Sequence, residues 1–373
     1  MNEPFVSIIM SNYNSELFVG KTIESVLNQT FTNFEFIIID DASSDSSREI
    51  IDGYNDSRII KYYFKQNEHM CYAFNYAISV SKGDYIARID CDDMWEPTKL
   101  QKQIEYMESN LECGACFSLV TVIDENENLL TSKHTDRVDL FETKNRTQAE
   151  WIRHFYFNGS CLCHPSVVIR KKVIEDVGIY NYSLVQIQDY DLWVRISKKY
   201  QIYIIQERLV RYRWFLSGKN VSALSDTTRN RSNFEFTYVL SRYFDDISDE
   251  MLIQAFGGDF IRKGTTDHIE LLCEKALLLL KPVFCGNLHR LGAMYKLVDL
   301  LQNENTRKIL REKYGVTQKN FYELSASPLF LDMQTQILLS NKNKCTFKDF
   351  LRKITPSPIW NLARQCYAII LKK

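Results

Sequence analysis

Three carboxylates occur within four positions in the stretch GDYIARIDCDDMW, where Asp90, Asp92 and Asp93 follow an apolar run. Carboxylates this close repel one another unless a cation or solvent offsets their charge. The cluster is therefore either a solvated turn or a metal site. An Asp-X-Asp pair at the end of a strand can hold a hard divalent ion, Mg²⁺ or Mn²⁺, and such ions commonly share carboxylates with substrate phosphates.

Two further polar clusters also follow apolar runs. The segment Ser11 to Asn14 comes after FVSIIM, and Asp40-Asp41 closes FEFIIID. In open α/β sheets, ligands bind beyond the carboxyl ends of the strands. Three polar clusters on one such edge favour a ligand site over a solvated turn. An alternative for Asp40-Asp41 is a turn closed by an Asx hydrogen bond.

Short apolar runs alternate with segments of helical periodicity through the first part of the chain. This alternation predicts an α/β fold in which a mostly parallel sheet is covered by helices on both faces. The pattern weakens after residue 125, where a strand leading into a helix is followed by a further helix and strand. The predicted strands are 5–10, 34–40, 58–64, 84–90, 113–124 and 201–214, with 163–174 as strand and helix and 188–200 as a helix.

The last third of the chain has a different character. From about residue 226 it is low in glycine and proline and predicts helices, so we expect a domain at 1–225 and a helical C-terminal region at 226–373. Residues 341–373 hold eight Lys or Arg residues and a single acidic residue. Within them, 346–373 includes an amphipathic helix starting at Ser357-Pro358. This segment either rests on an anionic membrane surface or docks on the helical region, and the sequence leaves both open.

The composition is that of a globular protein, with 45% apolar residues, 25% charged residues and a net charge of −1. Nothing in this balance indicates a nucleic-acid partner. No run approaches about 18 apolar residues, so no transmembrane helix is predicted, and FVSIIM lacks the length and basic flank of a signal peptide. We expect a cytoplasmic protein with reduced cysteines, peripheral on the inner membrane face if 346–373 binds lipid.

Two common phosphate-binding motifs are missing from the sequence, namely G-x-x-x-x-G-K-[ST] and G-x-G-x-x-G. A nucleotide must therefore be held by other groups. Asp41 can accept a hydrogen bond from a base imide N–H. Ser11 and Asn14 are short polar side chains beside the end of the first strand, where they can contact the same nucleotide.

Four segments resemble the motifs of family 2 glycosyltransferases with a GT-A fold. They are VSIIMSNYN, SVLNQTFTNFEFIIIDDASSD, KGDYIARIDCDD and QDYDLWVR, which follow the family's order over residues 4–215. The resemblance implies transfer of a sugar from a nucleotide diphosphate donor to an acceptor, with inversion at the anomeric carbon and with Mn²⁺ or Mg²⁺ as cofactor. We expect a UDP-sugar as donor and a glycan or lipid-linked glycan as acceptor, in cell-surface polysaccharide synthesis.

The resemblance also implies roles for single residues. It places Asp41 on the nucleobase with Ser11 nearby, Asp92 on the metal, and Asp90 on the metal and nearer the ribose and donor. Asp93 supports the pair, and Asp189 in QDYD falls at the position of the catalytic base. Arg213 resembles a basic residue that approaches the diphosphate, and His164 lies near the acceptor. Structural alternatives remain open, because Asp189 can cap a helix and Arg213 can be a surface arginine on a strand.

The sequence departs from the family pattern in several places, and one of them is Phe74-Asn75, which stands where the family often has Arg-Asn. Asn67-Glu68-His69 stands where the family often has Asn-X-Gly, and a histidine does not offer glycine's open backbone. Gln188 replaces a glutamate before the catalytic aspartate. Val210 stands where processive members carry glutamine, which favours the addition of a single sugar.

Two other functions are compatible with parts of the sequence. A phosphatase of the haloacid dehalogenase type also has an Asp-X-Asp after a strand, but with the motif near the start of the chain. A catalytically silent binding module with the same fold would carry the same motifs, since motifs report ancestry as well as activity.

Overall fold

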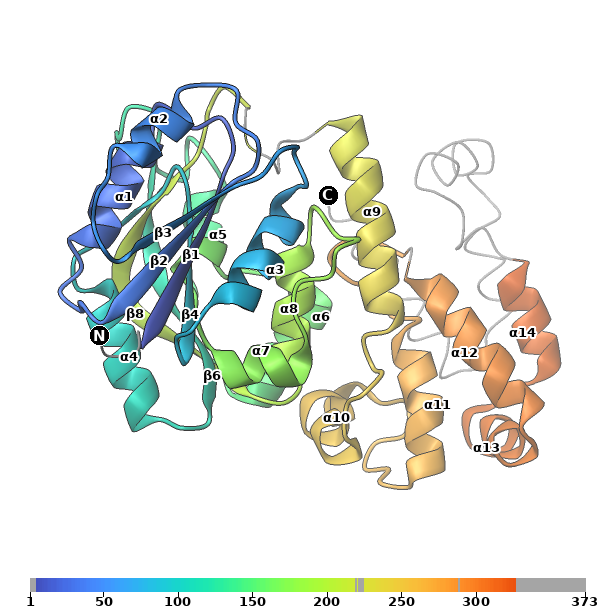
Figure 1. Ribbon diagram of the computed structural model, residues 1–373. Helices are drawn as coiled ribbons and strands as arrows, with labels where there is room; N and C mark the ends of the chain where they lie inside the picture. Colours follow the sequence, from blue (N-terminus) through green and yellow to red (C-terminus); the bar gives the residue numbers. More distant parts are fainter. Residues whose placement is uncertain (1–4, 219, 221–224, 288, 327–373) are drawn as a thin grey trace. The chain divides into compact units, whose positions relative to one another are not determined.

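The computed structural model describes residues 5–218, 220, 225–287 and 289–326. The basic segment 346–373 predicted to bind a membrane or the helical region lies outside the described residues. The described residues form two compact units, the first within 1–151 and 160–228 and the second within 152–159 and 229–326 (Figure 1). The short stretch 152–159 thus groups with the helical unit, although it precedes the last strands of the first unit.

The first unit contains a mixed eight-stranded sheet in the order β3-β2-β1-β4-β7-β6-β8-β5. Strands β3, β2, β1 and β4 are mutually parallel, and β6 is parallel to β8, whereas β7 and β5 run antiparallel to their neighbours. The strands are β1 (Val6–Asn12), β2 (Phe34–Asp40), β3 (Ile59–Tyr63), β4 (Tyr85–Asp90), β5 (Met94–Trp95), β6 (Cys113–Ile123), β7 (Val168–Arg170) and β8 (Gln201–Arg213).

Helices connect and cover these strands, which confirms the predicted α/β class. Every residue of β2 is buried, as expected for a parallel strand covered on both faces. The helices of this unit are α1 (Val19–Leu27), α2 (Ser47–Asp52), α3 (Met70–Val80), α4 (Lys99–Ser109), α5 (Arg137–Leu140), the start of α6 (Gln148–Asn158), η1 (His164–Ser166), α7 (Lys171–Val177) and α8 (Gln188–Ser197).

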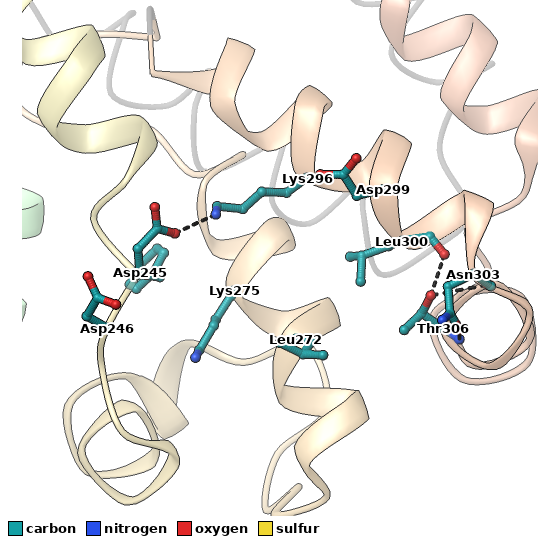
Figure 2. A pocket seen from close by; sticks show the side chains of 10 residues that line it. Asp245, Asp246, Leu272, Lys275, Lys296, Asp299, Leu300, Asn303 and Thr306 are labelled. Carbon is teal, nitrogen blue, oxygen red and sulfur yellow. Dashed lines mark hydrogen bonds and ion pairs between the residues drawn. The ribbon is translucent and has the colours of Figure 1, made fainter.

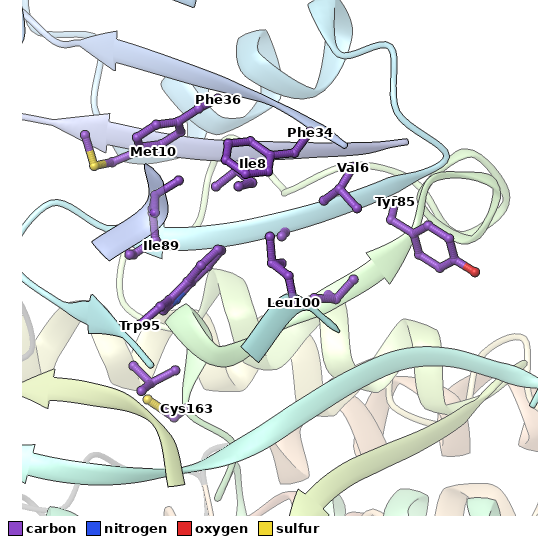
Figure 3. Close-up of a cluster of buried hydrophobic side chains, with 14 of the residues drawn as sticks. Val6, Ile8, Met10, Phe34, Phe36, Tyr85, Ile89, Trp95, Leu100 and Cys163 are labelled. Atoms are coloured by element: carbon purple, nitrogen blue, oxygen red, sulfur yellow. The ribbon is translucent and has the colours of Figure 1, made fainter. Parts of the chain in front are cut away.

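One hydrophobic core holds the sheet against its helices (Figure 3). Alternate residues of a strand point to the same face, so Val6, Ile8 and Met10 of β1 lie in one row. They pack beside Phe34 and Phe36 of the neighbouring strand β2. This burial fixes the register of β1 against β2 and β4, because a slip by one residue would move the apolar row to the other face.

The antiparallel strand β7 joins the two parallel parts of the sheet. Its last residue, Arg170, is buried and donates to the carbonyl of Cys113 at 3.0 Å and to the hydroxyl of Tyr85 at 2.6 Å. The guanidinium thereby links strands β4 and β6 on either side of β7. The predicted strand leading into a helix at 163–174 is found as β7 followed by α7, and the strand is limited to three residues because η1 precedes it.

The second unit is helical and has its own core, which includes Leu277, Leu297 and Leu310. Gly292 of α12 meets Ser241 of α9 so closely that an added Cβ would lie 2.4 Å from the serine Cβ, which requires glycine there. No helix of the described residues is long and apolar enough to cross a membrane. The helices are α9 (Asp226–Ser241), α10 (Asp249–Phe256), η2 (Gly257–Asp259), α11 (His268–Leu278), α12 (Arg290–Gln302), α13 (Glu304–Tyr314) and α14 (Gln318–Ser325).

Candidate active site

The parallel register brings the three polar clusters of the sequence together. Ser11 pairs with Ile39 of β2 on one side and with Asp90 of β4 on the other. Asn12, the last residue of β1, pairs with Asp40, the last residue of β2. The carboxyl ends of β2, β1 and β4 therefore form one polar edge, which is the arrangement expected from the strand pattern.

Asp40 is buried and stabilises this edge through hydrogen bonds. Its carboxylate is fully buried and accepts hydrogen bonds from Asn12 Nδ2 at 2.9 Å, from the Ser43 backbone N–H at 3.1 Å and from Arg48 Nε at 2.5 Å. Of the two alternatives for Asp40-Asp41, the turn closed by an Asx hydrogen bond thus describes Asp40. It does not describe Asp41.

Asn14 links two loops at this edge. Its Oδ1 accepts the Ser44 N–H at 2.8 Å, and its own backbone N–H donates to Ser43 Oγ at 3.0 Å. Asn14 is exposed and takes a positive φ of 50°, which asparagine tolerates better than most residues. Its side chain therefore fixes the wall of the edge, while Ser11 stays partly buried within it.

Asp41 lies in the next position and is 2% exposed. Its Oδ1 accepts the Glu68 N–H at 2.8 Å, and its backbone carbonyl accepts a hydrogen bond from Asn67 Nδ2 at 3.2 Å. Burial raises the pKa of Asp41, although the hydrogen bond from Glu68 opposes this. The loop that departs from the family's Asn-X-Gly pattern therefore folds directly onto Asp41.

His69 corrects one expectation from the sequence. It adopts φ 67° and ψ 161°, a backbone region populated almost entirely by glycine, so this histidine does take up the open glycine-like backbone. Such a conformation costs on the order of 1–3 kcal/mol in other proteins. The surrounding loop and the start of α3 therefore hold His69 in a strained conformation beside Asp41.

Arg88 is a site residue that the sequence analysis missed. Its side chain is 3% exposed, and Nη2 donates to Asp90 Oδ1 at 2.5 Å. The guanidinium carbon lies 4.4 Å from the centre of the Phe74 ring. Burial would lower the pKa of Arg88, but the negative charges of Asp90 and Asp189 outweigh it and raise that pKa. Arg88 and Asp90 are two positions apart on β4 and so share a face, which is a signal that the sequence does contain.

Asp189 lies in the first turn of α8 and is brought within electrostatic reach of this pair. Burial raises its pKa, the positive charge of Arg88 lowers it, and the negative charge of Asp90 raises it again. Its Oδ1 accepts the Tyr190 N–H at 2.8 Å. The N-cap of α8 is Ile187, so Asp189 does not occupy the cap position that the structural alternative assigns to it.

Asp92 and Asp93 differ in their surroundings. Asp92 is partly buried, and its pKa is raised by burial and by the charge of Asp90. Asp93 is 1% exposed, and its Oδ1 accepts the Arg213 backbone N–H at 2.7 Å. Among the described residues, Asp93 Oδ2 is buried without a hydrogen-bond partner. The cluster thus places three carboxyl groups close together in a partly dry environment, where burial and mutual repulsion raise the pKa of Asp92 and of Asp93.

Arg213 lies beside this cluster, but its donors are directed at the backbone. Its Nε donates to the Asp92 carbonyl at 2.8 Å, and Nη1 donates to the Asp124 carbonyl at 2.9 Å. The guanidinium carbon lies 4.6 Å from the centre of the Phe18 ring, and the side chain is 1% exposed. It is therefore not a surface strand arginine, and in this conformation it supports the Asp92 turn.

His164 and Tyr180 form a neutral pair near Arg88. His164 Nε2 lies 2.7 Å from the Tyr180 hydroxyl, within hydrogen-bond distance. Burial and the positive charge of Arg88 lower the pKa of His164 well below its usual value. The pair adds hydrogen-bonding capacity to the site without adding charge.

The donor set at Asp90 and Asp92 suits a hard divalent cation. Both side chains offer carboxylate oxygens, which Mg²⁺ and Mn²⁺ prefer, and Asp93 Oδ2 of the same turn is buried without a hydrogen-bond partner among the described residues. Within the described part of the chain, no group of three or more His, Cys, Asp or Glu residues could hold a metal ion.

The eight cysteines that the structure describes are all free thiols.

A separate cavity of about 440 Å³ lies in the helical unit (Figure 2). Its lining carries charges of both signs: Lys296 donates to Asp245 at 2.6 Å, and Lys275 lies 3.9 Å from Asp249, which is outside the lining. The carboxylates of Asp246 and Asp299 also line it. This mixture of signs contrasts with the concentrated carboxylates of the sheet edge.

The fold and the polar edge define a nucleotide-sugar transferase of the GT-A type, and comparison with known proteins agrees. The family described as "Glycosyl transferase family 2" matches residues 7–178. The chain is 35% identical over 218 residues to the uncharacterized glycosyltransferase MJ1057 of Methanocaldococcus jannaschii, covering 57% of this chain and 72% of that protein. The protein therefore belongs to glycosyltransferase family 2. The match to the family ends at residue 178, before Asp189.

One further relative supports the family assignment, and one solved structure supports the fold. A UDP-Glc:alpha-D-GlcNAc-diphosphoundecaprenol beta-1,3-glucosyltransferase of Escherichia coli, WfaP, is 31% identical over 196 residues, which cover 52% of this chain and 70% of that protein. The crystal structure of S. aureus TarS 1–349 matches with a TM-score of 0.54 at 13% identity, over 92% of this chain and 93% of that one. At that identity the structural match supports the fold alone.

Proposed function

We propose that this glycosyltransferase is an inverting, metal-dependent enzyme that moves a sugar from a UDP-sugar to a glycan or lipid-linked glycan in cell-surface polysaccharide synthesis. The observation that carries the proposal is the position of Arg88. It is paired with Asp90 of the Asp-X-Asp motif, while its charge also acts on Asp189 of α8. The buried guanidinium of Arg88 thus interacts both with Asp90, on the side of the site that would bind the donor, and with Asp189, the candidate base.

The sheet edge supplies the donor half. Asp41 contacts the nucleobase, with Ser11 beside it and Asn14 shaping the loop, and Asp90 lies toward the ribose and donor. Asp92 and Asp90 would hold the divalent ion, Mn²⁺ or Mg²⁺, through their carboxylate oxygens. When bound, the ion supplies Lewis-acid stabilisation of the charge on the departing diphosphate.

Asp189 supplies the acceptor half. An acceptor hydroxyl is a weak nucleophile, and Asp189 takes its proton as the hydroxyl attacks the anomeric carbon and the bond to the diphosphate breaks. Positioned general bases contribute about 10²–10⁴-fold to such reactions. Burial already raises the pKa of Asp189, which makes it a stronger base than an exposed aspartate. His164 lies near the acceptor and stays neutral, and Asp93 holds the turn that carries Asp92.

The proposed biological setting is based on the names of two similar proteins. The similar E. coli protein is named for transfer from UDP-Glc to a diphosphoundecaprenol-linked acceptor. A 118-residue match at 39% identity is to a Bacillus subtilis protein named as a putative teichuronic acid biosynthesis glycosyltransferase, TuaG. These names motivate a UDP donor, a lipid-linked acceptor and a cytoplasmic enzyme at the inner membrane face. The segment 346–373 is the proposed contact with anionic lipid.

The test measures release of nucleoside diphosphate by the full-length chain from UDP-, GDP-, dTDP- and CDP-sugars with Mn²⁺. We expect release from UDP-sugars that stops on chelation and falls at least about 100-fold in Asp92→Ala and Asp189→Asn. Asp136→Asn is the matched control, because that side chain is 86% exposed and lies outside the site. Release of inorganic phosphate would instead identify a phosphatase. If no donor releases nucleoside diphosphate or inorganic phosphate, the protein is a binding module.

A further inference from the structure

A cavity of about 210 Å³ opens on the surface of the first unit, between α3 and the loop that precedes α8. Helix α3 presents Tyr72, Asn75, Tyr76 and Ser79 to it, at the spacing i, i+3, i+4 and i+7 that places residues on one helix face. Ile179 and Tyr182 form the opposite wall. We refer to this cavity as the tyrosine groove.

Two tyrosines give the groove an exposed aromatic surface. Tyr72 is 43% exposed and Tyr182 is 57% exposed, and their ring centres lie 6.1 Å apart at an interplanar angle of 52°. Single exposed aromatic residues are common on proteins, but two that face one cavity from different segments indicate a binding surface.

The rings on the α3 side are held in place before any ligand arrives. Phe64 packs edge-on against both Tyr72 and Tyr76, with ring centres 5.6 Å and 5.5 Å apart. Tyr62 packs edge-on against Tyr76 at 5.1 Å. A surface that is ordered in advance loses little conformational entropy on binding, which favours affinity.

The opposite wall is attached to α3 by buried hydrogen bonds. Asn75, 3% exposed, donates to the Tyr180 carbonyl at 2.9 Å and accepts the Tyr180 N–H at 3.0 Å. Cys71 Sγ donates to the Leu184 carbonyl at 3.1 Å. The same segment continues into α8, which carries Asp189 in its first turn. The groove and the candidate base are thus built on one continuous stretch of chain.

The lining excludes several ligand classes. None of the described residues that line the groove carries a charge. Phosphates and nucleotides are recognised by Arg, Lys or helix N-termini, and surfaces that bind anionic lipid carry Lys and Arg beside their apolar residues. The volume is below the roughly 300–1,000 Å³ of pockets for drug-sized ligands, which suits one or two sugar rings.

We propose that the tyrosine groove binds a neutral oligosaccharide, namely the part of the acceptor glycan that trails the attacked sugar. The apolar C–H face of a pyranose packs on a tyrosine ring, while tyrosine hydroxyls and Ser79 Oγ meet the sugar hydroxyls. This inference rests on the proposed function, because it assigns the groove to that enzyme's acceptor. The inference specifies that the acceptor carries an uncharged glycan segment next to the sugar whose hydroxyl reacts.

The test measures saccharide binding without donor, so that it does not depend on catalysis. The full-length chain is titrated by calorimetry with cello-, laminari- and chitohexaose. We expect saturable binding of at least one hexasaccharide, weakened at least about 10-fold in Tyr72→Ala and Tyr182→Ala. Tyr72→Phe, which keeps the ring and loses only the hydroxyl, should weaken binding less than Tyr72→Ala does. Ser79→Trp, which fills the groove, should also abolish it. Tyr295→Ala, which removes a tyrosine that is 64% exposed on α12, is the matched control.

Either of two results would overturn the groove assignment: no hexasaccharide binds, or the Tyr72→Ala and Ser79→Trp proteins bind as the wild type does. Vesicles of phosphatidylglycerol test a third contrary result. If the alanine variants lose binding to these vesicles but still bind saccharide, the groove is a lipid-binding surface. Donor cleavage is measured alongside, and the Tyr295→Ala control should cleave donor as the wild type does. A wild type that binds hexasaccharide but cleaves no donor would contradict the proposed reaction and leave the groove supported.

Discussion

Arg88 on β4 and Asp90 two positions later form a buried ion pair, with 2.5 Å between Nη2 and Oδ1. The arginine is nearly inaccessible, whereas the Asp90 side chain is 30% exposed toward the polar edge. The pair therefore anchors the first carboxylate of the Asp-X-Asp motif from inside the protein. Because the charge of Arg88 also lowers the pKa of Asp189, the two halves of the proposed site are electrostatically linked.

Replacing Arg88 by glutamine should shift the pH dependence of the reaction. Without the guanidinium charge the pKa of Asp189 rises further, so the acidic limb of the kcat/KM profile for donor cleavage should move to higher pH. Arg88→Lys keeps the charge and should keep most of the original profile. An unchanged limb in Arg88→Gln, in a protein that still unfolds cooperatively, would show that Arg88 does not act on the base.

His69→Gly should stabilise the protein. Glycine adopts the φ of 67° without strain, and the relief of about 1–3 kcal/mol exceeds the roughly 0.5–1 kcal/mol of added unfolded-state entropy. We expect a gain of about 1 kcal/mol in urea unfolding. His69→Ala retains a Cβ and the strain, so it should give no gain. Equal or lower stability of the glycine variant would mean that the histidine side chain compensates for its backbone.

Lys99 should make stability depend on pH. It is fully buried, its Nζ has no hydrogen-bond partner among the described residues, and it lies 3.8 Å from the centre of the Trp95 ring. Burial lowers its pKa from 10.5 to about 7. Between these values the unfolded state binds more protons than the folded state, so stability should rise as pH increases from 7 toward 10.

Lys99→Met should remove this pH dependence and, near pH 7, stabilise the protein by about 1–3 kcal/mol, since an apolar side chain replaces a buried charge. Lys102→Met is the control on the same helix, because Lys102 pairs with Glu207 at the surface. Urea unfolding at several pH values measures both. A methionine variant with the wild-type slope between pH 7 and 10 would show that Lys99 is not the titrating group.

Arg213→Met should weaken metal use more than nucleotide binding. The arginine holds the Asp92 carbonyl, and loss of a group that orients a metal ligand typically costs about 10–100-fold in metal affinity. We expect the Mn²⁺ concentration for half-maximal donor cleavage to rise at least about 10-fold. Arg211→Met, on the exposed face of β8, is the control. A raised KM for donor at unchanged Mn²⁺ dependence would instead support a direct contact with diphosphate.

Much of the polar edge could be predicted from the sequence because its residues lie at strand ends. Ser11, Asp41 and Asp90 each follow an apolar run, and the parallel register then places Ser11 beside Asp90. Periodicity cannot separate adjacent residues with different roles, however. Asp40 is fully used by internal hydrogen bonds, whereas Asp41 meets the loop at Glu68. Only the folded loops distinguish the two.

The linear order of residues determined the α/β class, the polar edge and the helical C-terminal region, because strand and helix periodicities are local properties. Tertiary structure decided what no local pattern contains: Arg88 meets Asp90 and acts on Asp189, Arg213 points at backbone, and His69 takes a glycine-like conformation. These outcomes depend on which side chains face one another after β4, α8 and β8 have packed. Burial then sets the electrostatics, since the same charges interact weakly in water and strongly in a dry interior.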